Sequence, residues 1–331
     1  MFGPAGAQGR AISGARVRAP LTATACDDGG MVDYEELPWP DRVHETLSNP
    51  YPVGSVGRLT SFRSARAKLK RVKEVVKTMR LDAEGLRLDF WDVLRVERSV
   101  DAAMYRFVVD EPPALPSIWP VTTGEVLYNL RSALDHAAFE LSVIGLGRDL
   151  TPKEAEGSQF PLYDTCGKFA KNVPRQLPGV ADEVLALIER VQPYPERDSE
   201  HYPSLFDEAA YLLGVLNRLG NVEKHRHPHL VVHSVDGPSW QAGYPEPRLF
   251  YGPIEQGRVF AEMDYYPEYV PYQSLQPRFT FRPVLIDDDG PLSMPGVLHM
   301  MCVMVERVLD VLDPSPWFDG RREELTHLTT P

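Results

Sequence analysis

The sequence has little cysteine and no long apolar run. Its three cysteines, Cys26, Cys166 and Cys302, lie far apart among 331 residues and form no Cys-x-x-Cys pair. This spacing excludes a disulfide framework and a zinc finger, and it is typical of the reducing cytosol, so we expect a cytoplasmic location. No apolar run approaches the roughly 18 residues that a membrane-spanning helix needs. We therefore expect no membrane partner.

An excess of positive charge is also lacking. The formal net charge is -12 and the isoelectric point is about 5.3. Proteins that grip a polyanion usually present a strongly basic surface. The acidic balance argues against stable DNA binding and leaves room only for a local RNA site.

Nucleotide-binding and serine-hydrolase signatures are absent too. The chain has no GxxxxGK[S/T], GxGxxG or GxSxG pattern, so nucleotide folds and the common serine hydrolases have no support. The Asp-Asp-Asp-Gly run at 287–290 lacks the alternating ligands of a calcium loop and indicates a turn. We expect no cofactor.

The first 30 residues are unusual in composition. They carry Arg10, Arg16 and Arg18 with no acid before Asp27, and they lack the apolar stretch of a signal peptide. This composition is typical of a disordered tail, or of a chain whose true start is Met31. We interpret residues 1–55 as a flexible tail and lead-in.

Apolar spacing sets the expected elements. Helical periodicity predicts helices over residues 61–86, 122–144, 180–191, 204–223 and 295–312. Alternating apolar residues predict a hairpin from 90–97 and 103–109, and short strands at 230–233, 249–251, 259–263 and 279–281. Residues 150–178 resemble a loop anchored by 159–162.

The expected fold class is α+β: a bundle of four to five helices with a β-hairpin and a C-terminal β-rich insertion. We divide the chain into residues 1–55, a helical bundle with hairpin at 56–229, a β-rich segment with a returning helix at 230–313, and a tail at 314–331. The Tyr- and Pro-rich region 238–291 suggests no role. Apolar seams on several helices lead us to expect a homo-oligomer.

The helix at 122–144 carries the first polar cluster. Its seam is formed by apolar residues three and four apart (Leu127, Leu130, Leu134, Ala137 and Leu141), and its opposite face is polar (Glu125, Asn129, Ser132, His136 and Glu140). Arg131 flanks the seam, and Asp135 lies four residues on, within its reach. Gly145 and Gly147 are expected to stop the helix.

A second cluster, Glu223-Lys224-His225-Arg226, ends the helix at 204–223. Glu223 continues the apolar seam of that helix, and a carboxylate facing the core is costly unless it is paired. Arg131 is the natural partner because its charge is fixed and its planar fork suits a carboxylate. One hypothesis is therefore an Arg131–Glu223 ion-pair lock, joined by Asp135 and Arg226, in a non-catalytic scaffold or interaction protein.

The Arg131-x4-His136 spacing resembles the Arg-x4–6-His signature of HEPN proteins, many of which are metal-independent ribonucleases. The resemblance implies that Arg131 stabilises the phosphorane-like charge and that His136 handles a proton, which suits guanidinium and imidazole chemistry. Asn129, Asp135 and the 223–226 cluster would support them, and RNA would be the partner. Ser132 departs from the pattern, since Asn, Asp or His usually follows the arginine.

A wider set of blocks resembles an uncharacterised family of bacterial and phage proteins. The blocks are Asn-Leu-Arg-Ser-Ala-Leu-Asp-His at 129–136, Phe-Pro-Leu at 160–162, Gln-Pro-Tyr at 192–194 and Glu-Lys-His-Arg at 223–226. That family usually has Asp in place of Glu223. The resemblance covers roughly residues 60–230 and implies that the two polar clusters act together, without naming a reaction.

Alternating histidines give the third hypothesis. His225, His227 and His229 would share one side of a strand, although Pro228 interrupts the run. A metal-dependent hydrolase would use Asp135, His136, Glu223 and His225. The sequence leaves the ribonuclease, the scaffold and the hydrolase open.

Overall fold

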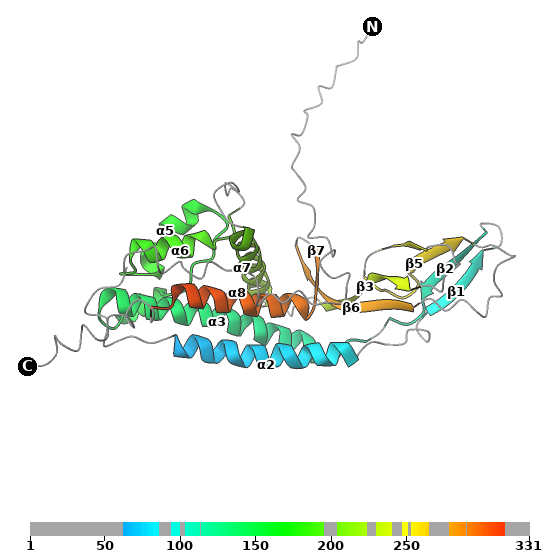
Figure 1. The fold of residues 1–331 in the computed structure, drawn as a ribbon, viewed down its shortest axis with the longest axis horizontal. Coiled ribbons are helices and arrows are strands. Elements are labelled where there is room, and N and C mark those ends of the chain that lie inside the picture. The colour runs from blue at the N-terminus through cyan, green and yellow to red at the C-terminus, as the bar shows by residue number, and fades with distance from the viewer. Residues whose placement is uncertain are drawn as a thin grey trace, which may run out of the picture. The chain divides into compact units, whose positions relative to one another are not determined.

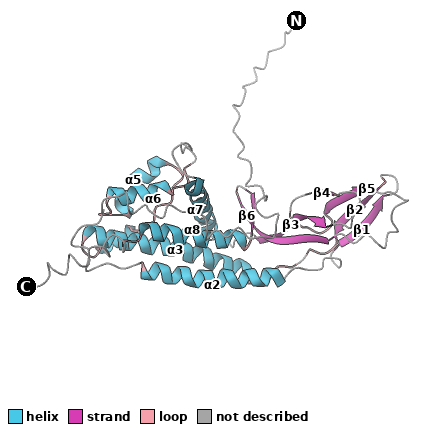
Figure 2. Cartoon of the chain, in the orientation of Figure 1, coloured by secondary structure: helices cyan, strands magenta, loops and turns pink. Residues whose placement is uncertain are grey.

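The computed structural model describes residues 62–85, 94–99, 103–112, 114–194, 204–223, 230–239, 247–250, 253–264, 278–288 and 290–314. These residues form helices and antiparallel sheets (Figures 1 and 2), which confirms a mixed α+β class. The described helices are α2 (Arg63–Gly85), α3 (Trp119–Leu146), α4 (Pro152–Gly157), α5 (Cys166–Gln176), α6 (Asp182–Arg190), α7 (Ser204–Glu223) and α8 (Gly296–Leu312). The described strands are β1 (Leu94–Ser99), β2 (Met104–Val109), β3 (Leu230–Ser239), β4 (Arg248–Leu249), β5 (Val259–Asp264), β6 (Arg278–Asp287) and β7 (Gly290–Ser293). The predicted tail and lead-in at 1–55 lies outside the described residues.

The main hydrophobic core lies between helices. Helix α3 contacts α2, α7 and α8, and α8 also contacts α2 and α7. Their apolar faces form one buried cluster, because each helix carries an apolar stripe at the spacing that a helix repeats. The predicted seam of α3 is confirmed: every one of its members is at most 1% exposed (Leu127, Leu130, Leu134, Ala137 and Leu141).

Ion pairs fix the direction of α2 against α8. Arg66, in the first turn of α2, donates hydrogen bonds to Asp310 and Asp313 at the end of α8, each at 2.7 Å. About two turns further along α2, the Lys73 ammonium contacts the Glu306 carboxylate at 2.5 Å. The two helices therefore run antiparallel.

The prediction of a loop over residues 150–178 is wrong, because α4 and α5 lie there. Helix α4 begins with a capping box, in which the Thr151 side chain accepts from the Glu154 amide and the Glu154 carboxylate accepts from the Thr151 amide. Helix α5 begins at the N-cap Thr165, whose side chain accepts from the Lys168 amide. Both helices are short and α5 contains Pro174, so neither shows a long periodic pattern.

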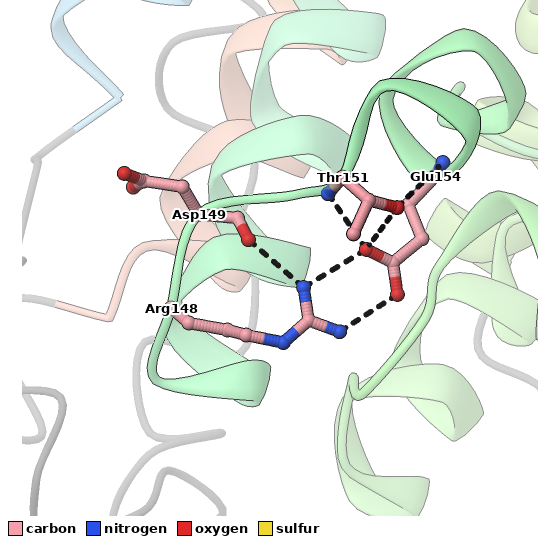
Figure 3. Close-up of polar contacts among 4 residues, drawn as sticks. All are labelled: Arg148, Asp149, Thr151 and Glu154. Atoms are coloured by element: carbon pink, nitrogen blue, oxygen red, sulfur yellow. Dashed lines mark hydrogen bonds and ion pairs between the residues drawn. The ribbon is translucent and has the colours of Figure 1, made fainter.

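Arg148 extends the α4 capping box into a small cluster (Figure 3). Its two terminal nitrogens donate to the two Glu154 carboxylate oxygens at 2.9 and 2.8 Å, and one of them also donates to the Asp149 carbonyl at 2.9 Å. The Arg148 hydrogen bonds, followed by those from Thr151, lower the pKa of Glu154 to about 2. The cluster therefore ties the end of α3 to the start of α4.

The two predicted stop glycines have different roles. Helix α3 ends at Leu146, and Gly147 forms its C-cap in the left-handed region with a φ of 63°. Gly145 lies inside the helix instead, and a Cβ on it would meet the Gly179 carbonyl oxygen at 2.1 Å. Gly145 is thus needed for a close backbone contact, and only Gly147 is a stop signal.

The strands form two antiparallel sheets. The predicted hairpin of β1 and β2 is confirmed, but β2 also pairs with β5, so that the sheet has the order β1-β2-β5-β4. Strands β3, β6 and β7 make the second sheet, and the 287–290 turn that joins β6 to β7 is confirmed. The hairpin thus shares a sheet with strands of the 230–313 segment.

Both sheets contribute side chains to buried clusters, and the β3-β6-β7 sheet contributes to two of them. Leu285 of β6 belongs to the helical core, whereas Val232 of β3 belongs to a second cluster with Phe107 and Phe260. No helix in the described part of the chain is long and apolar enough to cross a membrane.

Candidate functional site

Two side chains of α3 hold the peptide groups of Phe160. The Arg131 Nη2 donates a hydrogen bond to the Phe160 carbonyl oxygen, and the Phe160 amide donates to Asp135 Oδ1 at 2.9 Å. Arg131 Nε lies 3.5 Å from the same Asp135 oxygen. The two side chains therefore form an ion pair between residues one helical turn apart. The pair therefore acts on the backbone of a neighbouring segment as well as on itself.

The burial of the Arg131 guanidinium is only partly compensated by its neighbours. Burial lowers the pKa of its guanidinium, and the charges of Asp135 and Tyr163 only partly oppose that shift. Its Nη1 is buried and has no hydrogen-bond partner among the described residues. An unsatisfied donor in a buried position costs about 1–3 kcal/mol, so the fold holds Arg131 in place by its other contacts.

Gln192 holds the same segment from the other side. Its side chain is fully buried, and Nε2 donates to the carbonyl oxygens of Pro161 at 2.8 Å and Ile188 at 3.1 Å. Its Oε1 accepts a hydrogen bond from the Tyr163 amide at 2.9 Å. The amide thus uses both its donor and its acceptor on backbone groups that would otherwise be unpaired.

These contacts define what we call the 160–163 clamp: Arg131, Asp135 and Gln192 around the backbone of residues 160–163. Three of the sequence blocks singled out above meet here, namely those at 129–136, 160–162 and 192–194. The sequence grouped these blocks but gave no role to Gln192. The signal that could have indicated backbone pairing was weak: an amide side chain next to Pro193, directly after the predicted helix.

His136 faces a different element from Arg131. Its Nδ1 lies 2.5 Å from the Ser64 Oγ of α2. Asn129 donates to the Glu125 carbonyl of its own helix at 2.8 Å. Within one chain, the described contacts therefore bring Arg131 together with Asp135 and not with His136.

The second predicted cluster falls largely outside the described residues. Glu223 is the last residue of α7, but its side chain is not described, and Lys224, His225 and Arg226 lie outside the described ranges. The Arg131–Glu223 pair therefore stays a prediction. Among the described residues, no three His, Cys, Asp or Glu side chains are grouped as metal ligands, and the histidines at 225–229 lie outside them.

An ion pair that the sequence did not suggest joins α7 to β6. Arg218 binds Asp287 through Nε at 3.2 Å and Nη2 at 2.5 Å, and the Asp287 side chain is only 2% exposed. The 287–290 run was interpreted as a turn alone. The signal for the pair was weak: Arg218 stands beside the apolar seam residue Leu219.

Cys302 of α8 is a buried thiol without reactive character. Burial raises its pKa to about 12, with the Lys73 ammonium opposing the shift. A thiolate is the nucleophilic form of cysteine, so Cys302 is a core residue.

The outward face of α3 carries large apolar side chains. Ile118, at the N-cap, is 60% exposed, Val121 is 40%, Tyr128 is 64% and Phe139 is 41% exposed. Glu125, Ser132 and His136 lie between them on the same face. The sequence predicted a polar face here. The exposed apolar residues were not recognised because polar residues alternate with them along the helix.

No protein-family model, curated protein sequence or solved structure matches this chain.

Proposed function

We propose that this chain is a non-catalytic helical interaction protein. The observation that carries the proposal is the apolar outward face of α3, on which Ile118, Val121, Tyr128 and Phe139 are each at least 40% exposed. Exposed apolar patches at regular helical spacing are typical of surfaces that receive a partner. The function is therefore binding along α3.

The 160–163 clamp supports a structural role for the motif residues Arg131 and Asp135. A catalytic arginine must meet the developing charge of a substrate. Arg131 Nη2 is already bonded to the Phe160 carbonyl, and Nε faces Asp135. In this proposal the pair fixes the segment that flanks the interaction surface, and a pairing of Arg131 with Glu223 would add to the same lock.

The scaffold in this proposal is a bundle of four to five helices. Its members are α2, α3, α7 and α8, with α6 packed on α8. Such a bundle gives α3 a rigid position, since three helices cover its buried side. A rigid helix presents its outward face without an ordering cost on binding.

RNA cleavage in EDTA tests the proposal, with thermal unfolding of each variant alongside. We expect no cleavage by the wild-type chain, and lower stability of Arg131→Met because the Phe160 carbonyl loses its donor. His136→Ala should unfold close to the wild-type temperature, since His136 has one partly exposed contact with Ser64. Cleavage by wild type that is lost in a folded His136→Ala variant would overturn the proposal.

A HEPN-like, metal-independent ribonuclease is the second candidate, and the position of His136 favours it. His136 contacts Ser64 of α2, the helix whose exposed basic residues include Arg63, Lys70 and Lys77. A basic helix beside an imidazole would hold RNA phosphates near a proton carrier. RNA binding that weakens steeply with salt, together with EDTA-resistant cleavage, is the result that would select this candidate.

A further inference from the structure

The outward side of α2 carries a concentration of positive charge in a chain that is acidic overall. From Arg63 to Arg80 the helix has eight basic residues and one acid, Glu74, whereas the whole chain has a formal net charge of -12. Helix α2 lies at the edge of the helical bundle, where it contacts α3 and α8 (Figure 1). Independently of the interaction surface on α3, we infer that the outward side of α2 binds the phosphate backbone of duplex DNA without sequence preference.

Part of the positive charge of α2 is used inside the fold. Arg66 pairs with Asp310 and Asp313 at the end of α8. Lys73 pairs with Glu306 of the same helix. These pairs hold α2 against α8, so the two basic residues are not available to a further anion.

Three other basic residues, Arg63, Lys70 and Lys77, form what we call the α2 basic stripe. All three are exposed, and none has an ion pair within the described ranges. They stand seven residues apart, which is about 10.5 Å along the helix axis and about 20° around it, so they line one side of the helix over about 21 Å. The one acid of this stretch, Glu74, lies 3.8 Å from Arg71. The stripe therefore offers three uncompensated positive charges in a row.

Charge complementarity makes a polyanion the occupant of the stripe. Duplex DNA carries one negative charge per roughly 1.7 Å of its axis, and each neutralised phosphate releases counterions, which drives binding. Near physiological salt, charges more than about 8–10 Å away are screened, so the stripe outweighs the net charge of -12 at the contact. Three contacts make a weak, salt-sensitive site, which agrees with the expectation that stable DNA binding is absent.

The remaining side chains on this side of α2 favour a duplex, and DNA over RNA. The exposed residues among those described in α2 include no aromatic side chain on which an unpaired base could stack. Two exposed hydroxyls are already engaged, Ser64 with His136 and Thr78 with the Glu74 carbonyl. RNA duplexes are recognised largely through contacts to their 2′-hydroxyls. Fixed charges alone contact phosphates and read no base, so we expect equal binding to unrelated sequences.

Fluorescence anisotropy of a labelled DNA duplex, titrated with the full-length chain, tests the inference. The dissociation constant should rise about 40-fold from 50 to 200 mM salt, because three neutralised phosphates give a slope of about -2.7 on a double-logarithmic plot. Two duplexes of unrelated sequence should bind equally. Lys70→Gln should reduce the slope by about 0.9 and weaken binding to both duplexes alike.

Lys153→Gln is the matched control, because Lys153 is an exposed lysine of α4. It should leave the dissociation constant and the slope unchanged. The triple variant with Gln at all three stripe positions should lose DNA binding and keep the wild-type unfolding temperature, since the three side chains are exposed. No binding by the wild type at 50 mM salt, an equal loss in Lys153→Gln, or tighter binding to an RNA duplex of the same sequence overturns the inference. These results leave the interaction function standing, because the stripe shares no residue with the outward face of α3.

Discussion

Two arginine–aspartate pairs that involve the helices differ in what they join. Arg218 of α7 and Asp287 of β6 come from distant elements and meet through two hydrogen bonds, with Asp287 2% exposed. Arg131 and Asp135 come from one helix, lie 3.5 Å apart, and leave Asp135 33% exposed. The first pair holds two elements to each other by charge. The second holds a third segment by its backbone, and the charge attraction between its members is secondary.

Asp287→Ala is expected to have the largest effect. It removes two charge-assisted hydrogen bonds from Arg218, each worth about 1.5–3 kcal/mol. Because the Arg218 side chain is 35% exposed, water replaces part of this interaction, and the loss should be about 3–4 kcal/mol. Chemical denaturation of the purified chain measures the loss. Asp288→Ala, which removes the exposed neighbour, is the matched control and should change stability little. Equal effects of the two substitutions would contradict the assignment.

Gln192→Ala tests the uncharged side of the clamp. It removes the side-chain partner of the buried Pro161 carbonyl and of the half-buried Tyr163 amide, which should cost about 2–3 kcal/mol. Gln159→Ala changes the same residue type at an exposed position of the neighbouring segment and should be nearly neutral. Hydrogen exchange of the Tyr163 amide should become faster in Gln192→Ala, and an unchanged rate would show that the amide is held by something else.

Arg131→Met is expected to cost about 1–2 kcal/mol. The Phe160 carbonyl loses a donor, but the variant also removes a desolvated charge with one unpaired nitrogen, and these effects oppose each other. A double-mutant cycle with Asp135→Ala sharpens the comparison. The coupling energy of Arg131 with Asp135 should be smaller than that of Arg218 with Asp287. The reverse order would mean that the pair on α3 acts mainly through charge.

The Arg148–Glu154 pair, at the surface, should give the smallest effect and a pH signature. The pKa of Glu154 is lowered from 4.5 to about 2, so its contribution is complete above about pH 4.5 and is lost as the pH falls towards 2. The stability difference between wild type and Glu154→Gln should therefore shrink over that window, measured by denaturation at each pH. A difference that stays constant down to pH 2 would show that the carboxylate charge has no part in the cluster.

The long helices could be predicted because their apolar residues repeat over several turns. The seam of α3 and the stripe of α8 were placed correctly for this reason, with Val297, Leu298 and Met301 all buried. Helices α4 and α5 were missed because both are short, although Thr151 and Glu154, with Pro152 at the first helical position, are a start signal for α4. Side chain–backbone capping leaves only a short sequence signal.

The sequence singled out Arg131 and Asp135 of the 160–163 clamp and missed Gln192. Charge pointed from Arg131 to another charged residue, Glu223, whereas the described contact of Arg131 outside its own helix is a backbone carbonyl. Every residue has such a carbonyl, so no pattern marks the one at Phe160. The pairing of β2 with β5 was equally invisible, because a hairpin sequence carries no mark of its next neighbour.

The pairing of β2 with β5 also delays the completion of the sheet during synthesis. Val108 of β2 pairs with Val259 of β5, so about 150 residues must be made after the hairpin before its second partner exists. At about 5–20 residues per second, the β2 edge stays open for roughly 8–30 s on the ribosome. The outer strand β1 presents charged residues, Arg95, Glu97 and Arg98, during that interval. The nascent hairpin has one charged edge and one unpaired edge. We therefore expect chaperones to bind it early in synthesis and to prevent wrong strand pairing at β2.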